Sequence, residues 1–195
     1  MKKETIFRTF SKMPTLQTER LTLRRLSVRD AADMFDYAHR ADVTRYLTWS
    51  AHPDVSYSRE YLEYLQGRYA GGMYYDWGIV YKENGKMIGT CGFTSFNCSH
   101  DKAEIGYVLH PDYWGKGIAP EAVKKILDFG FEKLNLHRIE ANFIKENARS
   151  LRVMEKVGMT FEGYAKEAML IKGNYVTVGT CAVLRSDWEK QQKKK

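Results

Sequence analysis

The segment 103–144 constrains the fold more than any other part of the chain. It starts as a β-type run and continues into a turn-rich loop, 110–120, that contains Gly115 and Gly117. The loop opens a helix whose apolar face is marked at helical spacing by Val123, Ile126, Leu127, Phe131 and Leu134. A second β-type run closes the segment at about 138–144. Because a strand, a crossover helix and a strand make parallel neighbours, the segment predicts a βαβ unit.

The remaining β-type runs predict antiparallel pairing. Asn84-Gly85 is a strong hairpin signal between two of them, and Lys172-Gly173-Asn174 joins the last two. Together with the βαβ unit, they predict a mixed α/β fold with a mostly antiparallel sheet of about seven strands and one central parallel pair. The runs outside the βαβ unit are 19–24, 75–81, 87–96, 161–171 and 175–185.

About four helices are expected to flank this sheet. Ser27, with Asp30 three residues later, is typical of a helix N-terminus, and Pro120 suits the first turn of the helix after the glycine loop. Gly158 ends the last helical pattern. The four expected helices cover about 28–40, 58–70, 120–134 and 147–157.

The composition is that of one globular domain. Of the 195 residues, 44% are hydrophobic and 28% charged, which provides enough apolar material for a core. We expect a loose N-terminal lead-in at 1–15, one domain over 16–186 and a basic tail at 187–195. Four of the lysines behind the net charge of +7 lie in 190–195. Most of the excess charge therefore belongs to a solvated tail, although a basic surface also favours an acidic partner or a polyanionic cofactor.

The chain shows no sign of a metal site, a disulfide framework or a membrane span. The three cysteines lack C-x-x-C spacing and the five histidines lack H-x-x-x-H spacing. No apolar stretch approaches the roughly 20 residues that a membrane helix needs, and the first residues lack the apolar core of a signal peptide. We therefore expect a soluble, cytoplasmic protein with no metal and no membrane partner. Direct nucleic-acid binding is not expected, because no aromatic and basic RNA-binding motif is present.

The glycine loop predicts an anion site, because unpaired N–H groups and the positive end of a helix dipole meet there. It does not match the two best-known nucleotide loops. A dinucleotide fingerprint that began at Gly115 would need a third glycine where Pro120 stands, and a P-loop would need Ser or Thr after Lys116, where Gly117 stands.

Four stretches resemble the GNAT superfamily of acetyl-CoA-dependent N-acetyltransferases. Their order, spacing and expected secondary structure agree with that family over about residues 16–186. Trp114 stands where Gln or Arg is usual, a departure typical of the branch that resembles bacterial ribosomal-protein N-terminal acetyltransferases. The stretches are Leu16–Arg24, Ala103–Leu109, Trp114–Ala119 and Asn147–Met159.

The resemblance implies a cosubstrate, acetyl-CoA, and a place for it. The pyrophosphate would lie on the backbone of the loop, and the pantetheine arm would enter between the two parallel strands, which are splayed apart to admit it. Lys116 could contact phosphate or be a solvated lysine, and Asn147 could bind the pantetheine arm, cap its helix, or do both. The residues implied in cosubstrate binding are Tyr107, Val108, Leu109, Trp114, Gly115, Lys116, Gly117, Ile118, Ala119, Asn147 and Ser150.

Two residues are candidates for proton transfer. Glu104 resembles the family glutamate that draws a proton from the amine through water, but it could also be an ordinary strand-end carboxylate. Met154 stands where many members carry a tyrosine that protonates the leaving thiolate, and methionine has no proton to give. Ser150, on the same helix face, resembles the serine proposed for that role in the ribosomal-protein branch. Tyr107 and Tyr164 are alternatives.

The implied activity is transfer of an acetyl group from acetyl-CoA to a primary amine by direct attack in a ternary complex. The N-terminal α-amine of a protein, ribosomal proteins included, is the leading acceptor, because its ordinary pKa of about 8 is lower than that of lysine at about 10.4. The alternatives are a small amine, such as a polyamine or an antibiotic, a CoA-binding domain without catalysis, and a basic RNA-associated module. The sequence does not decide between monomer and homodimer.

Overall fold

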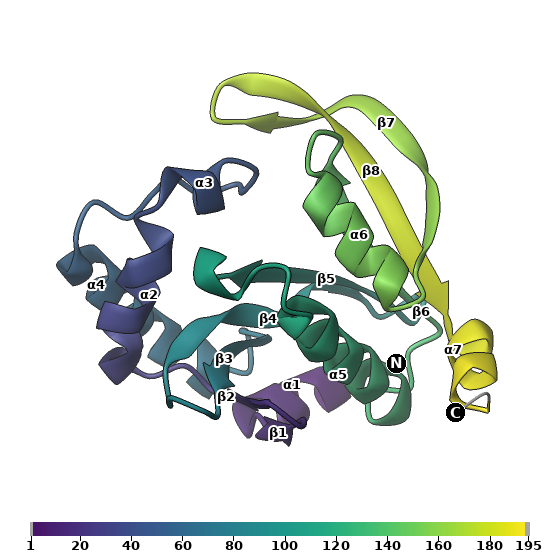
Figure 1. The fold of residues 1–195 in the computed structure, drawn as a ribbon. Coiled ribbons are helices and arrows are strands. Elements are labelled where there is room, and N and C mark those ends of the chain that lie inside the picture. Colours follow the sequence, from purple (N-terminus) through teal and green to yellow (C-terminus); the bar gives the residue numbers. More distant parts are fainter. Residues whose placement is uncertain (1, 194–195) are drawn as a thin grey trace.

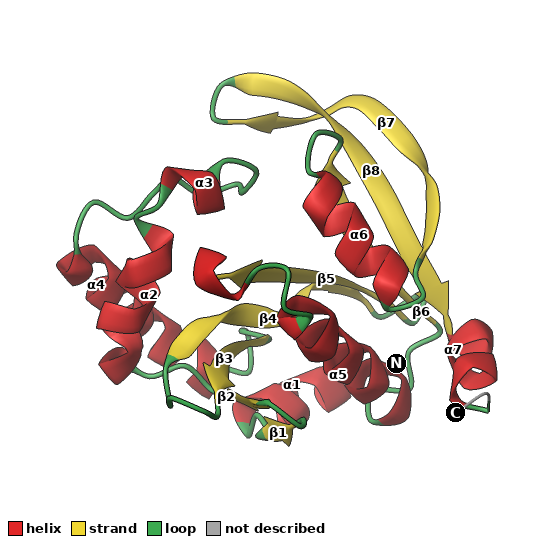
Figure 2. Ribbon diagram, viewed as in Figure 1, coloured by secondary structure: helices red, strands yellow, loops and turns green. Residues whose placement is uncertain are grey.

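The computed structural model describes residues 2–193 and contains one mixed sheet (Figures 1 and 2). The strand order is β1-β2-β3-β4-β5-β6-β8-β7. The strands are β1 (Leu16–Gln17), β2 (Leu21–Arg24), β3 (Asp76–Tyr81), β4 (Met87–Asn97), β5 (Lys102–Leu109), β6 (Arg138–Ile144), β7 (Thr160–Ile171) and β8 (Asn174–Leu184).

Seven α-helices accompany these strands in the described part of the chain, with one short 3-10 turn before α2 and another after β5. The helices are α1 (Lys3–Ser11), α2 (Ala31–Ala38), α3 (Ala41–Thr44), α4 (Val55–Ala70), α5 (Ile118–Glu132), α6 (Ala148–Lys156) and α7 (Arg185–Gln192).

The pairing of β5 with β6 is parallel, and the other strand pairs are antiparallel, as the βαβ pattern predicts. Helix α5 makes the crossover between the two parallel strands. The expected mixed α/β architecture is confirmed. The sheet has eight strands rather than about seven, because the two-residue strand β1 was too short to give an alternating pattern.

The two faces of the sheet are covered by different helices (Figure 2). On one face, α5 and α6 pack over the large core that contains Ile105, Ile126 and Met154. On the other face, α2 and α4 form a second cluster around Met34 and Leu62. Because strand residues alternate between faces, neighbouring residues of β5 point to opposite faces of the sheet.

The expectation of a loose lead-in at 1–15 is wrong for Lys3–Ser11, which forms α1. Phe10 is fully buried and meets five aromatic rings edge-on or tilted. Apolar burial of this size stabilises a short helix that would be marginal alone. The rings belong to Tyr75, Trp77, Phe93, Phe96 and Phe129.

The expectation that the ordered domain ends at residue 186 is also wrong, although Lys190 and Lys193 of the basic tail are exposed to solvent. Helix α7 extends to Gln192, and the Trp188 ring stacks on Phe131 with centroids 5.3 Å apart. The Trp188 indole donates to Asp128 Oδ1 at 2.7 Å. Lys194 and Lys195 lie outside the described residues. Within residues 2–193, no helix is long and apolar enough to cross a membrane.

Candidate active site

The parallel strands β5 and β6 separate at Glu104. Their paired residues are Lys102 with Arg138, Ala103 with Ile139 and Glu104 with Glu140, and the pairing ends there. Strand β5 continues to Leu109, held on its other side by β4. The backbone edge of 105–109 that faces β6 is therefore available to an extended ligand. This is the splayed parallel pair that the family resemblance implied.

The candidate residues of β5 lie on opposite faces of the sheet. Glu104, Gly106 and Val108 alternate with Ile105 and Tyr107. Val108 packs against the cluster of α2 and α4, whereas Tyr107 packs against the core that α5 and α6 cover. A ligand between the strands can thus be reached by Glu104 from one face and by Tyr107 from the other.

The loop before α5 has the backbone that an anion site needs. Gly115 and Gly117 both have φ of 76°, the left-handed region that favours glycine, and Gly117 is the N-cap of α5 without a side-chain cap. A Cβ on Gly115 would meet no atom within 4 Å. Gly115 is thus favoured by its left-handed backbone conformation, and no atom of the protein fills the space where a side chain would project. The uncapped N–H groups at the start of α5 suit a pyrophosphate.

The predicted loop residues do not all contribute in the same way. The Ile118 side chain is buried in the core, so only its backbone N–H can serve the site. Lys116 is exposed, and its Nζ lies 5.6 Å from the centre of the Tyr113 ring. Its charge is therefore placed beside the loop and is free to meet phosphate. Ala119, in the first turn of α5, is partly exposed.

Trp114 is held at the junction of β5 and the loop. Its Nε1 donates to the carbonyl of Leu109 at 2.8 Å, and the Arg149 guanidinium lies 4.6 Å from the centre of its ring. Arg149 belongs to the first turn of α6, so this contact joins the two helix N-termini across the separated strands. Arg149 could not be identified from the sequence, because no local pattern connects it with Trp114.

Asn147 and Ser150 stand at the start of α6. Asn147 Oδ1 accepts from the backbone N–H of Ser150 at 3.2 Å, so Asn147 is the helix N-cap. Its amide nitrogen remains able to donate. The Tyr107 hydroxyl lies 2.8 Å from Ser150 Oγ and donates to the Ser150 carbonyl at 3.0 Å. Burial raises the pKa of Tyr107 well above its usual value, while the hydrogen bond with Ser150 lowers it.

Glu104 is a half-buried carboxylate that is hydrogen-bonded to Asn142, which is in turn hydrogen-bonded to Thr180. Burial raises its pKa, and the nearby charge of Glu140 acts in the same direction. A hydrogen bond from the Asn142 side chain lowers the pKa. Thr180 Oγ1 donates to Asn142 Oδ1 at 2.7 Å, which fixes the amide so that its nitrogen faces Glu104. Asn142 and Thr180 carry no local motif that would identify them from the sequence.

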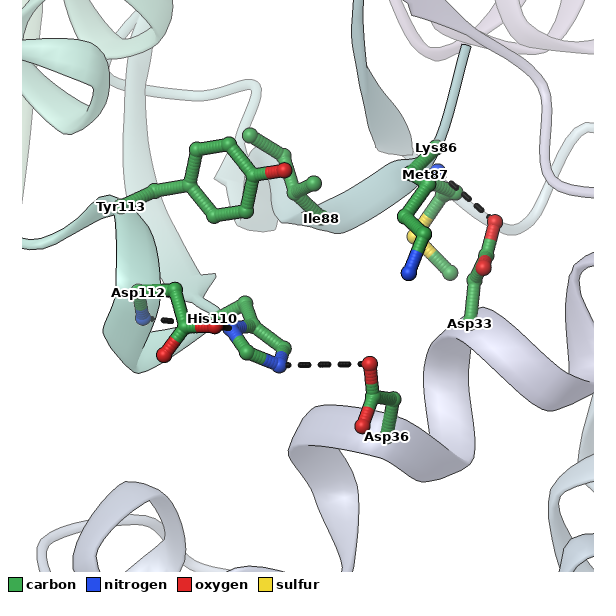
Figure 3. Close-up of a pocket in the computed structure, with 8 residues that line it drawn as sticks. All are labelled: Asp33, Asp36, Lys86, Met87, Ile88, His110, Asp112 and Tyr113. Atoms are coloured by element: carbon green, nitrogen blue, oxygen red, sulfur yellow. Dashed lines mark hydrogen bonds and ion pairs between the residues drawn. The ribbon is translucent and has the colours of Figure 1, made fainter. Parts of the chain in front are cut away.

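A small pocket of about 50 Å³ lies between α2, β4 and the end of β5 (Figure 3). His110 Nδ1 accepts from the backbone N–H of Asp112 at 3.2 Å, and its Nε2 lies 3.4 Å from Asp36 Oδ2. The backbone N–H of Met87 donates to Asp33 at 2.9 Å. The pocket has room for only a water or two, so it is too small for a cosubstrate. The contact between His110 and Asp36 joins the loop after β5 to α2.

Within residues 2–193, no group of three or more His, Cys, Asp or Glu side chains is placed to hold a metal ion. The site thus consists of a glycine loop at a helix N-terminus, two parted strands, and ionisable side chains on both faces. These features suit an anionic group at the start of α5 and an extended ligand between the parted strands.

Comparison with known proteins agrees with these features. A family model described as Acetyltransferase (GNAT) domain matches residues 20–160. The uncharacterized N-acetyltransferase p20 of Bacillus licheniformis is 36% identical over 176 residues, which are 90% of this chain and 99% of that protein. The spermidine N(1)-acetyltransferase of Vibrio cholerae is 27% identical over 168 residues, covering 86% of this chain and 95% of that one.

The structural comparison gives the same result. The ribosomal-protein-S5-alanine acetyltransferase of Vibrio fischeri has a TM-score of 0.76 and 26% identity over 90% of this chain and 98% of that one. The chain belongs to the GNAT acetyltransferase family and is an acetyl-CoA-dependent N-acetyltransferase. The resemblance inferred from the sequence is confirmed.

Proposed function

We propose that the chain transfers an acetyl group from acetyl-CoA to the N-terminal α-amine of a protein, ribosomal proteins included. The observation that carries the transfer reaction is the separation of β5 from β6, with Glu104 on one face and the Tyr107–Ser150 pair on the other. This arrangement keeps the group that takes a proton apart from the group that gives one.

The proposed site uses backbone and side chains for different tasks. The loop from Gly115 to Ala119 and the first turn of α5 bind the pyrophosphate, and the edge of 107–109 binds the pantetheine arm. Acetyl-CoA, when bound, supplies an acetyl thioester. Glu104 takes a proton from the amine through water, and a backbone N–H near Val108 polarises the carbonyl oxygen.

Ser150 is the proposed proton donor to the departing thiolate. Tyr107 donates to the Ser150 carbonyl, so the hydroxyl of Ser150 can donate either to Tyr107 or to a group between the strands. Met154 is buried in the core at 1% exposure and offers no proton. Tyr107, in contact with Ser150, is the second donor of this pair.

The α-amine is favoured because a carboxylate is a weak base, even one whose pKa burial has raised. An α-amine with an ordinary pKa of about 8 loses its proton about 10²-fold more readily than a lysine at about 10.4. A small amine is the second candidate acceptor, and the relative named as a spermidine N(1)-acetyltransferase supports it.

We propose a cytoplasmic location for the protein, because its free thiols Cys91, Cys98 and Cys181 suit a reducing compartment.

Thermal unfolding with CoA, acetyl-CoA and NADH tests the cosubstrate half of this proposal. A ligand that binds only the folded protein raises the unfolding midpoint. We expect CoA and acetyl-CoA to raise it and NADH to leave it unchanged. Thiol release with N-terminal peptides and with small amines then tests the acceptor. Faster release with diamines than with any peptide would replace the α-amine by a small-molecule acceptor.

A further inference from the structure

The turn between β1 and β2 holds the glycine loop from outside the cosubstrate site. Arg20 Nη1 donates to the carbonyl of Lys116 at 2.9 Å. Lys116 lies between the two left-handed glycines, so this bond fixes one of the two peptide carbonyls between their Cα atoms. Arg20 Nη2 lies 3.5 Å from the position that a Cβ on Gly117 would occupy. The Arg20 guanidinium thus lies against the loop that is proposed to bind the pyrophosphate.

The same arginine binds Glu121 in the first turn of α5. Its Nε donates to Glu121 Oε2 at 2.6 Å, and its backbone N–H donates to Oε1 at 2.9 Å. Thr18 Oγ1 donates to Oε1 at 2.5 Å. Burial raises the pKa of Glu121, but the hydrogen bonds from Thr18 and Arg20 outweigh it and lower the pKa overall. Glu121 is therefore charged at neutral pH.

A second hairpin keeps the turn itself in place. Lys82 donates its backbone N–H to the Arg20 carbonyl at 3.0 Å, and its Nζ donates to the Thr18 carbonyl at 2.5 Å. Arg20 is thus fixed at its backbone and at its side chain. A guanidinium with five donors in a rigid fork can hold a carbonyl and a carboxylate together, which a lysine ammonium does with less directional control.

We propose that Arg20 is a positioning residue for the pyrophosphate loop and thereby sets the affinity for the nucleotide half of CoA. The inference rests on the proposed cosubstrate site. Arg20 holds the Lys116 carbonyl away from the phosphates, so that the neighbouring N–H groups face them. It also neutralises Glu121, whose charge would otherwise repel phosphate at the N-terminus of α5. The reacting groups on β5 and α6 are left untouched.

The test compares acetyl-CoA with S-acetylpantetheine, which has the same thioester but no pyrophosphate. In Arg20→Met we expect the KM for acetyl-CoA to rise about tenfold or more, with kcat and the KM for the amine unchanged. The kcat/KM with S-acetylpantetheine should stay within about twofold of the parent enzyme. Equal losses with both thioesters, or an unchanged KM for acetyl-CoA, would overturn the proposal.

Calorimetric titration with CoA gives the same comparison without turnover. We expect the CoA dissociation constant of Arg20→Met to rise about tenfold or more, and that of Arg20→Lys to rise less. Arg59→Met, an exposed arginine on α4, is the matched control and should bind CoA as the parent does. Absence of CoA binding by the parent would refute the proposed function, whereas equal binding by parent and Arg20→Met would refute this inference alone.

A double variant separates position from charge. If Arg20 acted only by neutralising Glu121, then Arg20→Met with Glu121→Gln would restore the parent affinity for CoA. We expect the double variant to stay at least about fivefold weaker than the parent, because the Lys116 carbonyl remains unheld. Full recovery would reject the positioning role. Arg20→Lys serves as the second variant if Arg20→Met does not fold.

Discussion

Asp76 on β3 has a buried carboxyl group with incomplete hydrogen bonding. Its Oδ1 is shielded from solvent and has no hydrogen-bond partner among the described residues. Burial raises its pKa to about 7, although hydrogen bonds from Thr90 and Tyr74 act in the other direction. In the unfolded chain the same group ionises near pH 4. Between these values only the folded protein holds the proton, so the free energy of unfolding falls as the pH rises from about 4 to about 7.

We expect Asp76→Asn to remove this loss. At pH 8 the variant should be more stable than the parent by about 1–3 kcal/mol, because an uncompensated buried charge is gone. At pH 4, where the folded parent is already protonated, the two should differ little. Urea unfolding at both pH values measures the difference, with Glu60→Gln as an exposed control. The same change in stability at pH 4 and pH 8 would contradict the assignment.

Glu104 gives a prediction for the reaction. As the proposed proton acceptor it must be ionised, so kcat/KM of the parent should fall as the pH drops through the raised pKa of Glu104. Glu104→Gln should lower kcat/KM by about 10²-fold and lose this acid limb, with the KM for acetyl-CoA unchanged. Steady-state rates across pH measure both effects. Asn142→Leu removes the hydrogen bond that lowers the pKa of Glu104, so the acid limb of the pH profile should move to higher pH. An acid limb that stays at the same pH would argue against Glu104 as the proton acceptor.

At the scale of elements, α1 shows how much stability a short segment can add. Phe10 is fully buried and Phe7, on the same helix, is 52% exposed. We expect Phe10→Ala to lower the free energy of unfolding by about 3–5 kcal/mol, the usual cost of an aromatic core cavity. Phe7→Ala, the matched control, should cost much less. Urea unfolding of both variants provides the measurement, and equal losses would show that α1 does not pack as described.

The elements that could be predicted were those with long periodic patterns. Segment 103–144 has alternating residues, a glycine loop and an amphipathic helix in sequence, and each agrees with the structure. Helix α1 escaped prediction because its nine residues hold few apolar positions and are stabilised by contacts with distant rings. Trp188 in α7 is held by Phe131 in the same way.

The residues of the candidate site also differ in whether the local sequence indicates them. The conformation of Gly115 and Gly117 could be predicted from the local sequence, because it depends on their own backbone. Ser150 was named through the family resemblance, and its role stays a prediction. Arg20 could not be placed, since its partners Lys116 and Glu121 lie about 100 residues further along the chain. Long-range polar contacts of this kind leave no periodic signal in the sequence.

At the scale of the whole molecule, the β7–β8 hairpin and α3, here called the two arms, are joined by a hydrogen bond. The β7–β8 hairpin and α3 face each other in Figure 1, and Lys172 Nζ at the hairpin turn donates to the carbonyl of Thr44 at 2.7 Å. Thr44 is the last residue of α3, on the side of the sheet that α2 and α4 cover and that Glu104 faces. The proposed amine would therefore approach beneath this contact.

Loss of the contact should change which acceptors reach the site. A single hydrogen bond adds about 1 kcal/mol net, so Lys172→Ala should let the two arms part up to about fivefold more often. We expect the ratio of kcat/KM for a long peptide to that for a dipeptide to rise by up to this factor, with the KM for acetyl-CoA unchanged. Thiol release with both peptides measures it, and Lys166→Ala, an exposed lysine of the same hairpin, is the control. An unchanged ratio would show that acceptors enter without passing this bridge.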